Sequence, residues 1–255
     1  MSYDSVNTSR RLPIVFCVDV SPSMNTKATD VSYSRMDLAN RVINVIVDEL
    51  RKNNKAWSAA EIAVVTFTEK IIRNDMEFQP ISSFSVPTFS TVSPGGTNLA
   101  NAIMTSIEKL ENVKSGYISH SIRFYLPFLI LITDGNTDQN EDSQRLELAI
   151  KAIHEHCVSH GNGDNIIIPY VIGVGSGVEE KTLNKMAELF MKKAIIIDDD
   201  MMRNEEEIIS EVLQLIGSSI TKSVNLSTYA ASYKQIARKA KTVTEKLEER
   251  RRKIL

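Results

Sequence analysis

The chain has 255 residues, of which 42% are hydrophobic and 24% are charged. This composition excludes a disordered or fibrous protein, and the length favours one α/β domain with an appendage over two full domains. The formal net charge of −2 conceals a basic tail of +7 at residues 221–255 and an acidic remainder of −9.

Short apolar runs alternate along the chain with longer stretches of helical period, which predicts β-α-β units and a mostly parallel sheet. Strands are predicted at Leu12–Asp19, Glu61–Thr68, Ile71–Phe78, Leu126–Thr133, Ile166–Val174 and Ala194–Asp198. The third strand follows the second after almost no gap, and such a short link permits only a hairpin. We therefore expect five parallel strands and one antiparallel strand at an edge of the sheet.

Helices are predicted where apolar residues recur every three or four positions. Their apolar faces run from Met36 to Leu50, Leu99 to Leu110, Leu146 to Cys157, Leu183 to Phe190 and Ile208 to Ile216. The segment Val113–Arg123 is predicted as an insertion after the second helix. The expected fold is a Rossmann-like, doubly wound α/β domain over residues 11–219, with a six-stranded sheet, helices on both faces and a flexible N-terminus at 1–10.

Residues 220–255 are predicted as a separate, basic helical extension. Apolar and aromatic residues step by three and four from Leu226 to Leu247, which indicates a long C-terminal helix of about 28 residues with a heptad-like stripe. Two interpretations stay open: the helix packs along its own domain, or it binds a partner or a second copy of the chain. Nucleic acid is not expected as a ligand, because the basic residues partly alternate with Glu and few aromatic residues lie among them.

The two cysteines, Cys17 and Cys157, give no disulfide framework, which predicts a reducing, cytoplasmic location. The pair Arg10–Arg11 is similar to the start of a twin-arginine signal. However, the apolar run after it ends at Asp19 without a small-residue cleavage site, as a buried strand would. The longest apolar run elsewhere, residues 124–133, is far below the roughly 20 residues of a membrane helix, so no membrane association is expected.

Small oxygen-bearing side chains follow the predicted strands at their carboxyl ends, where ligands bind in open α/β sheets. The first strand runs into Asp19, Ser21 and Ser23 in the pattern Asp-x-Ser-x-Ser, and the fourth ends in Thr133-Asp134-Gly135. Gly95-Gly96-Thr97-Asn98 precedes a predicted helix. Hydroxyl and carboxylate oxygens suit a hard cation, with Mg²⁺ expected first and Mn²⁺ or Ca²⁺ as alternatives.

Together the three motifs resemble the metal-ion-dependent adhesion site of von Willebrand factor A domains, over about residues 11–217. The resemblance implies that Ser21 and Ser23 bind the metal directly. It further implies that Thr97 binds directly in one state and through water in another, while Asp19 and Asp134 act largely through water. An Asp or Glu of a partner protein then fills the remaining position. Flanking residues are expected to contact that partner: Met24, Gly95, Gly96, Asn98, Gly135 and Asn136.

Within that family, the chain is similar to bacterial TerY-like proteins in its length, its single-domain form and its Arg11-Leu-Pro-Ile-Val lead-in. Those proteins are associated with tellurite and stress-response gene clusters, which implies a neighbouring Ser/Thr kinase or phosphatase as the partner. One departure from the family is Pro22, where many relatives carry Gly. Proline fixes its own φ and biases Ser21 toward extended backbone.

The alternative is an enzyme in which Asp19 is the nucleophile of Mg²⁺-dependent phosphoryl transfer, as in haloacid-dehalogenase-like phosphatases. That class needs a second Asp at position 21 as general acid, where this chain has Ser, so we expect a binding protein and not an enzyme. His154, His156 and His160 lie in one short window, but Cys157 continues the apolar stripe there and the helix dipole favours histidines near a helix C-terminus, so a soft-metal site is only the lesser alternative. Asp198–Asp200 is expected to be a turn that leads into a helix, with a secondary cation site as the lesser alternative.

Overall fold

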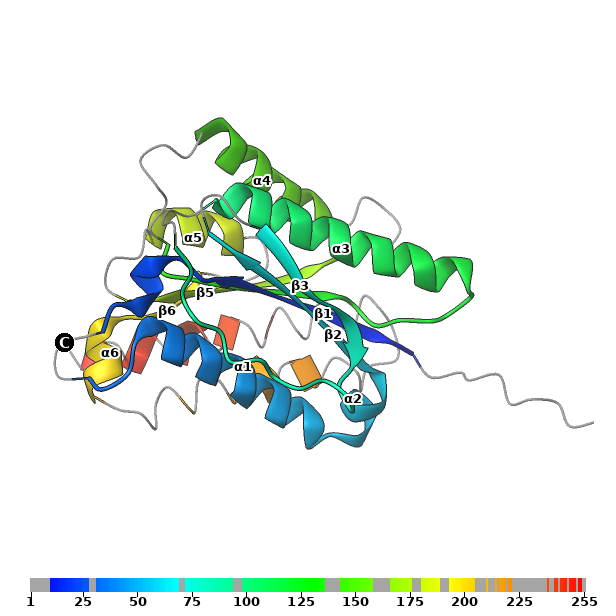
Figure 1. Ribbon diagram of the computed structural model, residues 1–255, viewed down its shortest axis with the longest axis horizontal. Coiled ribbons are helices and arrows are strands. Elements are labelled where there is room, and N and C mark those ends of the chain that lie inside the picture. The colour runs from blue at the N-terminus through cyan, green and yellow to red at the C-terminus, as the bar shows by residue number, and fades with distance from the viewer. Residues whose placement is uncertain are drawn as a thin grey trace, which may run out of the picture.

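Strands of one sheet form the centre of the molecule in this computed structural model (Figure 1). They are β1 (Leu12–Asp19), β2 (Ala60–Phe67), β3 (Ile72–Pro80), β4 (Phe128–Thr133), β5 (Ile168–Val174) and β6 (Ile195–Ile197). The structure describes residues 10–27, 31–68, 72–93, 98–135, 143–157, 166–175, 180–188, 193–204 and separate positions between 210 and 253. The α/β class is as predicted, and β1 has the predicted bounds.

The strands lie in the order β3-β2-β1-β4-β5-β6, and every neighbouring pair is parallel except β2 and β3. The prediction of one antiparallel edge strand is therefore confirmed. Chain order reverses at β1, because β2 and β3 lie on one side of it and β4 to β6 on the other. Ligands in open α/β sheets bind at the carboxyl ends of the strands beside such a switch point.

Helices cover both faces of the sheet, with α1 and α2 on one face and α3 and α4 on the other (Figure 1). The helices are α1 (Arg35–Arg51), α2 (Asn54–Ala59), α3 (Leu99–Ser119), α4 (Ser143–Cys157), α5 (Glu180–Ala187) and α6 (Asp199–Asn204), with a short 3₁₀ helix at Pro22–Asn25. Sequence patterns did not predict α2 or the 3₁₀ helix. No helix among the described residues has both the length and the apolarity needed to cross a membrane.

The central strands are buried along their whole length. Every residue of β1 and β4 is buried, as expected for parallel strands covered by helices on both faces. The Cys17 side chain lies in this core, where burial raises the pKa of its thiol to about 12. Continuous apolar runs therefore predicted these strands well.

Helix α3 continues to Ser119 and so includes the first part of the segment Val113–Arg123, which was predicted as an insertion. The prediction was wrong because charged residues of α3 interrupt the apolar pattern and are nevertheless buried. Lys109 forms an ion pair with Glu77 at 2.7 Å, and Lys114 pairs with Glu111 at 2.8 Å. Because each ammonium group has a carboxylate partner, both lysine side chains can be buried without leaving an unpaired charge.

The last turns of α3 attach the helix to the amino end of the sheet. The Tyr117 hydroxyl donates a hydrogen bond to Glu61 of β2, and the Tyr117 ring lies 5.7 Å from that of Phe124, centroid to centroid. Glu61 also pairs with Arg11 at 3.3 Å. This cluster fixes α3 over β1 and β2 at the end of the sheet opposite the predicted metal site.

Helix α1 begins with a reciprocal pair of hydrogen bonds, a capping box. Ser34 Oγ accepts a bond from the Asp37 backbone N–H at 3.1 Å, and Asp37 Oδ2 accepts one from the Ser34 backbone N–H at 2.7 Å. The bonds that the Ser34 backbone N–H and the Ser34 hydroxyl donate to Asp37 Oδ2 lower the pKa of Asp37 below its usual value. The box fixes where the helix starts, and thereby the place of Arg35, its first residue.

The predicted C-terminal helix lies mostly outside the described residues. The positions described between 238 and 253 are helical. Glu248 forms an ion pair with Lys193 at 2.9 Å, and Thr244 is buried. These contacts favour the interpretation in which the tail packs along its own domain. The helix predicted around Ile208–Ile216 is also described only in part, with Ile216 buried.

Candidate metal centre

The loop after β1 gathers three of the predicted ligands. The Ser21 backbone N–H donates to Asp19 Oδ1 at 2.9 Å, and the hydroxyl oxygens of Ser21 and Ser23 lie 2.9 Å apart. Pro22 opens the 3₁₀ helix, a position where its fixed φ fits, and Ser21 before it is extended at φ −62° and ψ 157°. Proline is therefore accommodated in this loop without loss of the convergence of the two hydroxyls.

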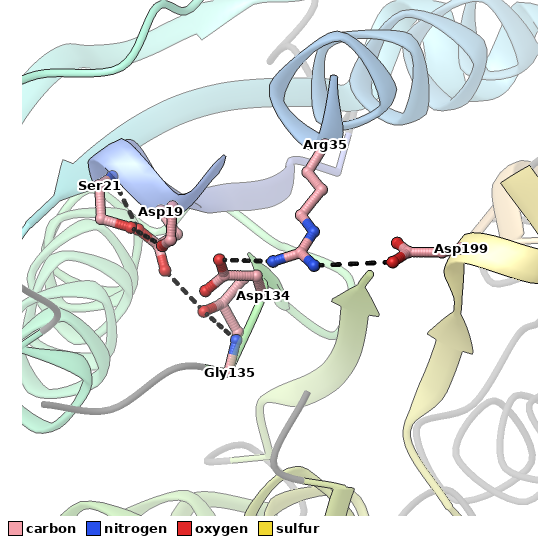
Figure 2. A network of polar contacts seen from close by, with 8 residues as sticks. Asp19, Ser21, Arg35, Asp134, Gly135 and Asp199 are labelled. Atoms are coloured by element: carbon pink, nitrogen blue, oxygen red, sulfur yellow. Dashed lines mark hydrogen bonds and ion pairs between the residues drawn. The ribbon is translucent and has the colours of Figure 1, made fainter. Parts of the chain in front are cut away.

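The end of β4 supplies the next part of the site (Figure 2). Thr133 Oγ1 donates to Asp19 Oδ2 at 2.7 Å and accepts a bond from the Gly135 backbone N–H at 3.0 Å. Gly135 has a φ of +70°, a value that glycine adopts without steric cost, so the chain turns sharply after Asp134. The two strand ends are thereby joined through hydrogen bonds, with Asp19 and Asp134 both at this edge.

The two aspartates are fully buried, with no exposed side-chain surface. Burial, followed by the negative charge of Asp134, raises the pKa of Asp19 to about 7, although the hydrogen bonds from Ser21 and Thr133 act in the opposite direction. Arg35 of α1 reaches the same place, and its NH1 donates to Asp134 Oδ2 at 3.2 Å. The edge thus carries two buried acids, an arginine and converging hydroxyls.

This set of groups fits a hard divalent cation. All the candidate ligands are carboxylate or hydroxyl oxygens, which Mg²⁺ prefers. Two carboxylates buried at one edge also favour a positive charge between them, because like charges in a buried site otherwise oppose ionisation. Among the described residues, no group of three or more His, Cys, Asp or Glu side chains could hold a metal. A site here therefore depends on the serine hydroxyls.

The third predicted motif is described only at its end. Gly95, Gly96 and Thr97 lie outside the described residues, as does Asn136. Asn98 is described, and its side chain caps α3 by accepting a bond from the Asn101 backbone N–H at 3.2 Å. The Asn98 backbone N–H donates to the carbonyl of Thr68 at 3.2 Å, so α3 begins beside the carboxyl end of β2.

The structure corrects the role predicted for Met24. This side chain was expected on the surface, in contact with a partner, but it is fully buried. The 3₁₀ helix turns Met24 inward, where it joins the apolar core beneath the loop. Its contribution to the site is therefore packing.

The histidines at the end of α4 are described only in part. His154 Nε2 donates to the backbone carbonyl of Lys185 at 2.7 Å, which joins α4 to α5 and occupies that nitrogen. The side chain of His156 and all of His160 lie outside the described residues. Asp199 and Asp200, predicted as a helix start, do begin α6.

Arg35 is the residue of this region that sequence patterns missed. Its guanidinium lies between the carboxylates of Asp134 and Asp199, as Figure 2 shows. One signal in the sequence marks it. A cation at the first position of a helix opposes the helix dipole, so an arginine placed there needs carboxylates nearby. Those partners lie far along the chain, and only the fold brings them together.

Comparisons with known proteins agree with this architecture. The chain is similar to the conserved hypothetical protein BatB from Bacteroides thetaiotaomicron, with a TM-score of 0.51, 19% identity and coverage of 83% of this chain and 100% of that one. It is also similar to the PilB minor pilin from Streptococcus sanguinis, with a TM-score of 0.53, 16% identity and coverage of 87% and 64%. The SpRpn10 VWA domain gives a TM-score of 0.51 at 11% identity, with coverage of 82% and 96%.

These structural likenesses concern the fold alone, and no curated protein matches the sequence. The family model of the von Willebrand factor type A (VWA) domain matches residues 14–211, which is most of the chain and includes all three motifs. The chain therefore belongs to the von Willebrand factor type A domain family.

Proposed function

We propose that this protein is a metal-dependent binding module that recognises an acidic residue of a partner protein. VWA domains generally mediate protein–protein interactions, often through a metal. The observation that supports the role here is the meeting of Asp19, Asp134 and the paired hydroxyls of Ser21 and Ser23 at the switch point of the sheet. Thr97 is proposed as the fifth metal-binding residue.

The proposed cation is Mg²⁺, with Mn²⁺ or Ca²⁺ as alternatives. Serine hydroxyls are neutral ligands, so a bound cation keeps much of its positive charge. A carboxylate from a partner is then attracted more strongly than at a site with several directly bound acids. The residues proposed to flank that carboxylate are Asn98, Gly135, Asn136, Gly95 and Gly96, and the buried Met24 is left out of this set.

Metal binding is tested by titrating the full chain with Mg²⁺ and with Mn²⁺ in a calorimeter. We expect binding by the wild type and a loss of about 100-fold or more for Ser21→Ala, because loss of supporting groups around a metal already costs 10- to 100-fold. Ser83→Ala is the matched control. Its hydroxyl is exposed and donates to the carbonyl of Pro80, away from the site. Equal affinity of wild type and Ser21→Ala contradicts the proposed ligand set.

Partner binding is tested by affinity capture from bacterial lysate in Mg²⁺ and in EDTA. A partner that contacts the metal is lost in EDTA and with Ser21→Ala, and retained with Ser83→Ala. We propose a Ser/Thr kinase or phosphatase in the same, cytoplasmic compartment, as the likeness to TerY-like proteins implies. A partner retained in EDTA but lost when Lys241 and Lys246, both exposed, are changed to Glu assigns recognition to the tail instead.

The phosphoryl-transfer alternative gains no support from the geometry. Asp19 is fully buried, and its two carboxylate oxygens accept bonds from Ser21 and Thr133. A nucleophile has to reach the phosphorus atom of its substrate. Incubation with para-nitrophenyl phosphate and Mg²⁺ tests this point: turnover that Asp19→Asn abolishes would favour the enzyme.

A further inference from the structure

Arg35 lies at a helix position that is unfavourable for a positively charged side chain. It is the first residue of α1, where the helix dipole repels positive charge. Its side chain is only 8% exposed, and burying a guanidinium is costly unless carboxylates pair with it. An arginine here is therefore held by contacts that outweigh both costs.

Those contacts come from Asp134, directly after β4, and from Asp199, the first residue of α6. NH1 of Arg35 donates to Asp134 Oδ2 at 3.2 Å, and NH2 lies 3.9 Å from Asp199 Oδ2 (Figure 2). The third nitrogen, Nε, is buried and has no hydrogen-bond partner among the described residues. In its position between the two acids, the guanidinium therefore lacks, within the described part of the chain, the hydrogen bond that Nε could donate.

The surrounding backbone is shaped to admit this side chain. Gly175, at the end of β5, has a φ of +98°, and a Cβ atom there would lie 2.1 Å from Nε of Arg35. The Arg35 backbone N–H donates to the carbonyl of Thr26 at 3.0 Å, which ties the residue to the loop that carries Ser21 and Ser23. Arg35 is therefore built into the same edge of the sheet as the proposed metal ligands.

We propose that Arg35 is the resident counter-cation of the metal site proposed above: it offsets the charge of the buried acids when no metal is bound and thereby weakens the binding of divalent cations. The reason is electrostatic. The acids Asp19 and Asp134 lie at one edge, and Arg35 contacts Asp134 directly. A divalent cation that enters meets an acidic pair whose charge is already partly neutralised, and it is repelled by the guanidinium.

The same charge favours the partner's carboxylate. With Arg35 in place, the occupied site keeps one more positive charge than the acids and the metal alone would give. An incoming Asp or Glu gains from that charge without touching the arginine, which is buried. In this role, Arg35 weakens the binding of the cation, so that the cation can exchange with solvent. It also strengthens the attraction between the metal-bound site and the partner's carboxylate.

The test compares the Mg²⁺ and Mn²⁺ affinities of the full-length wild type with those of Arg35→Gln and Arg35→Met, measured by calorimetry on the metal alone. Gln keeps a donor toward Asp134 but loses the charge, whereas Met loses both. We expect the two variants to bind both cations about tenfold or more tighter than the wild type. Arg35→Lys, which keeps the charge, is expected to remain within about threefold of the wild type, a change much smaller than that of a unit charge.

Arg51→Met is the matched control on the same helix. Arg51 also pairs with an acid, Asp48 at 3.4 Å, and donates to the carbonyl of Phe84 at 2.6 Å, but it lies at the opposite end of α1. We expect Arg51→Met to lower the thermal midpoint without a change in metal affinity. An equal gain in affinity for Arg51→Met would overturn the proposal, because the effect would then follow from loosening the domain.

The remaining outcomes separate this proposal from that of the metal site. If the wild type binds Mg²⁺ and the two neutral Arg35 variants bind it with equal or lower affinity, the counter-cation role is overturned and the metal site is retained. Absence of binding in the wild type and in both neutral variants overturns both proposals. Variants that fold only when Mg²⁺ is added support the role, because the metal then replaces the missing charge. Variants that stay unfolded at an Mg²⁺ concentration about tenfold above the wild-type Kd show that Arg35 has a purely structural function. This outcome overturns the counter-cation role.

Discussion

The two ends of the sheet each hold an arginine against an acid, half-buried Glu61 at the amino end and buried Asp134 at the carboxyl end, and the remaining contacts of the two acids differ. At the amino end, Glu61 forms an ion pair with Arg11 at 3.3 Å and accepts a hydrogen bond from the Tyr117 hydroxyl. Burial, followed by the hydrogen bond to Glu61, raises the pKa of Tyr117 above its usual value, so the hydroxyl stays a donor. One acid thus has two donors, and the cluster is closed by aromatic packing.

At the carboxyl end, the described residues place one arginine beside three acids. Arg35 contacts Asp134 and Asp199, and Asp19 lies at the same edge with hydrogen bonds from neutral groups only among its described contacts. A buried charge that has its partner is tolerated in a fold, whereas a surplus of one sign is costly and is reduced when an ion of the other sign binds. The difference separates a structural cluster from the proposed metal site.

Gly175→Ala is the largest expected disturbance of the carboxyl end. The added Cβ would overlap Arg35 Nε at 2.1 Å on a backbone with φ of +98°, so the variant forces the guanidinium away from its acids. We expect the free energy of unfolding in urea to fall by about 3 kcal/mol. Gly116→Ala is the control, since nothing lies within 4 Å of its Cβ in α3, and it should stabilise by about 0.5–1 kcal/mol. Equal effects at the two glycines would contradict the packing described for Arg35.

Tyr117→Phe tests the amino end and is expected to have the next largest effect. It removes a buried donor from a charged acceptor, which costs about 2 kcal/mol in the free energy of unfolding. Because the cluster is distant from the carboxyl ends of the strands, affinity for Mg²⁺ should be unchanged. Urea unfolding and calorimetry on the same preparation measure the two quantities. A parallel loss of Mg²⁺ affinity would show that the two ends are coupled.

Asp37→Asn is expected to have the smallest effect, and one that depends on pH. The pKa of Asp37 is lowered in the folded state, so its contribution is complete above the unfolded value of about 3.9 and is lost as pH falls through the folded value. The side chain is largely exposed, so we expect a cost of about 0.5–1 kcal/mol at pH 7 that shrinks toward pH 2. Ser34→Ala removes the reciprocal half of the capping box. The double variant should lose less free energy of unfolding than the sum of the losses in the two single variants. A cost that is independent of pH would contradict the role of the carboxylate.

Apolar patterns predicted the elements that carry a strong period. β1 was predicted residue for residue, because its apolar run ends abruptly at Asp19. Helix α2 was missed because six residues are too few to show a helical period. Its available signal is Asn53, whose side chain accepts bonds from the backbone N–H groups of Lys55 and Ala56. Short elements are thus marked by their caps and not by their faces.

The candidate site was predictable where its residues follow strand ends. Asp19, Ser21 and Asp134 are such residues, and the structure brings the two acids to one edge. Arg35 was not predictable in the same way, because Asp134 lies 99 positions further along the chain. Met24 was predicted wrongly, since proximity to a ligand in sequence does not show which side chains of a tight turn face the core.

The hydrogen bond from Thr133 to Asp19 joins positions 114 residues apart, and this separation has a consequence for the newly made chain. Contacts between distant segments form after local ones, and domains emerge from the ribosome amino end first. A nascent or truncated chain that ends before β4 carries the whole Asp-x-Ser-x-Ser loop but lacks the strand that orients Asp19. The proposed metal site is therefore complete only after β4 has been made and has paired with β1, and we expect a chain that ends before β4 not to bind Mg²⁺ at this edge.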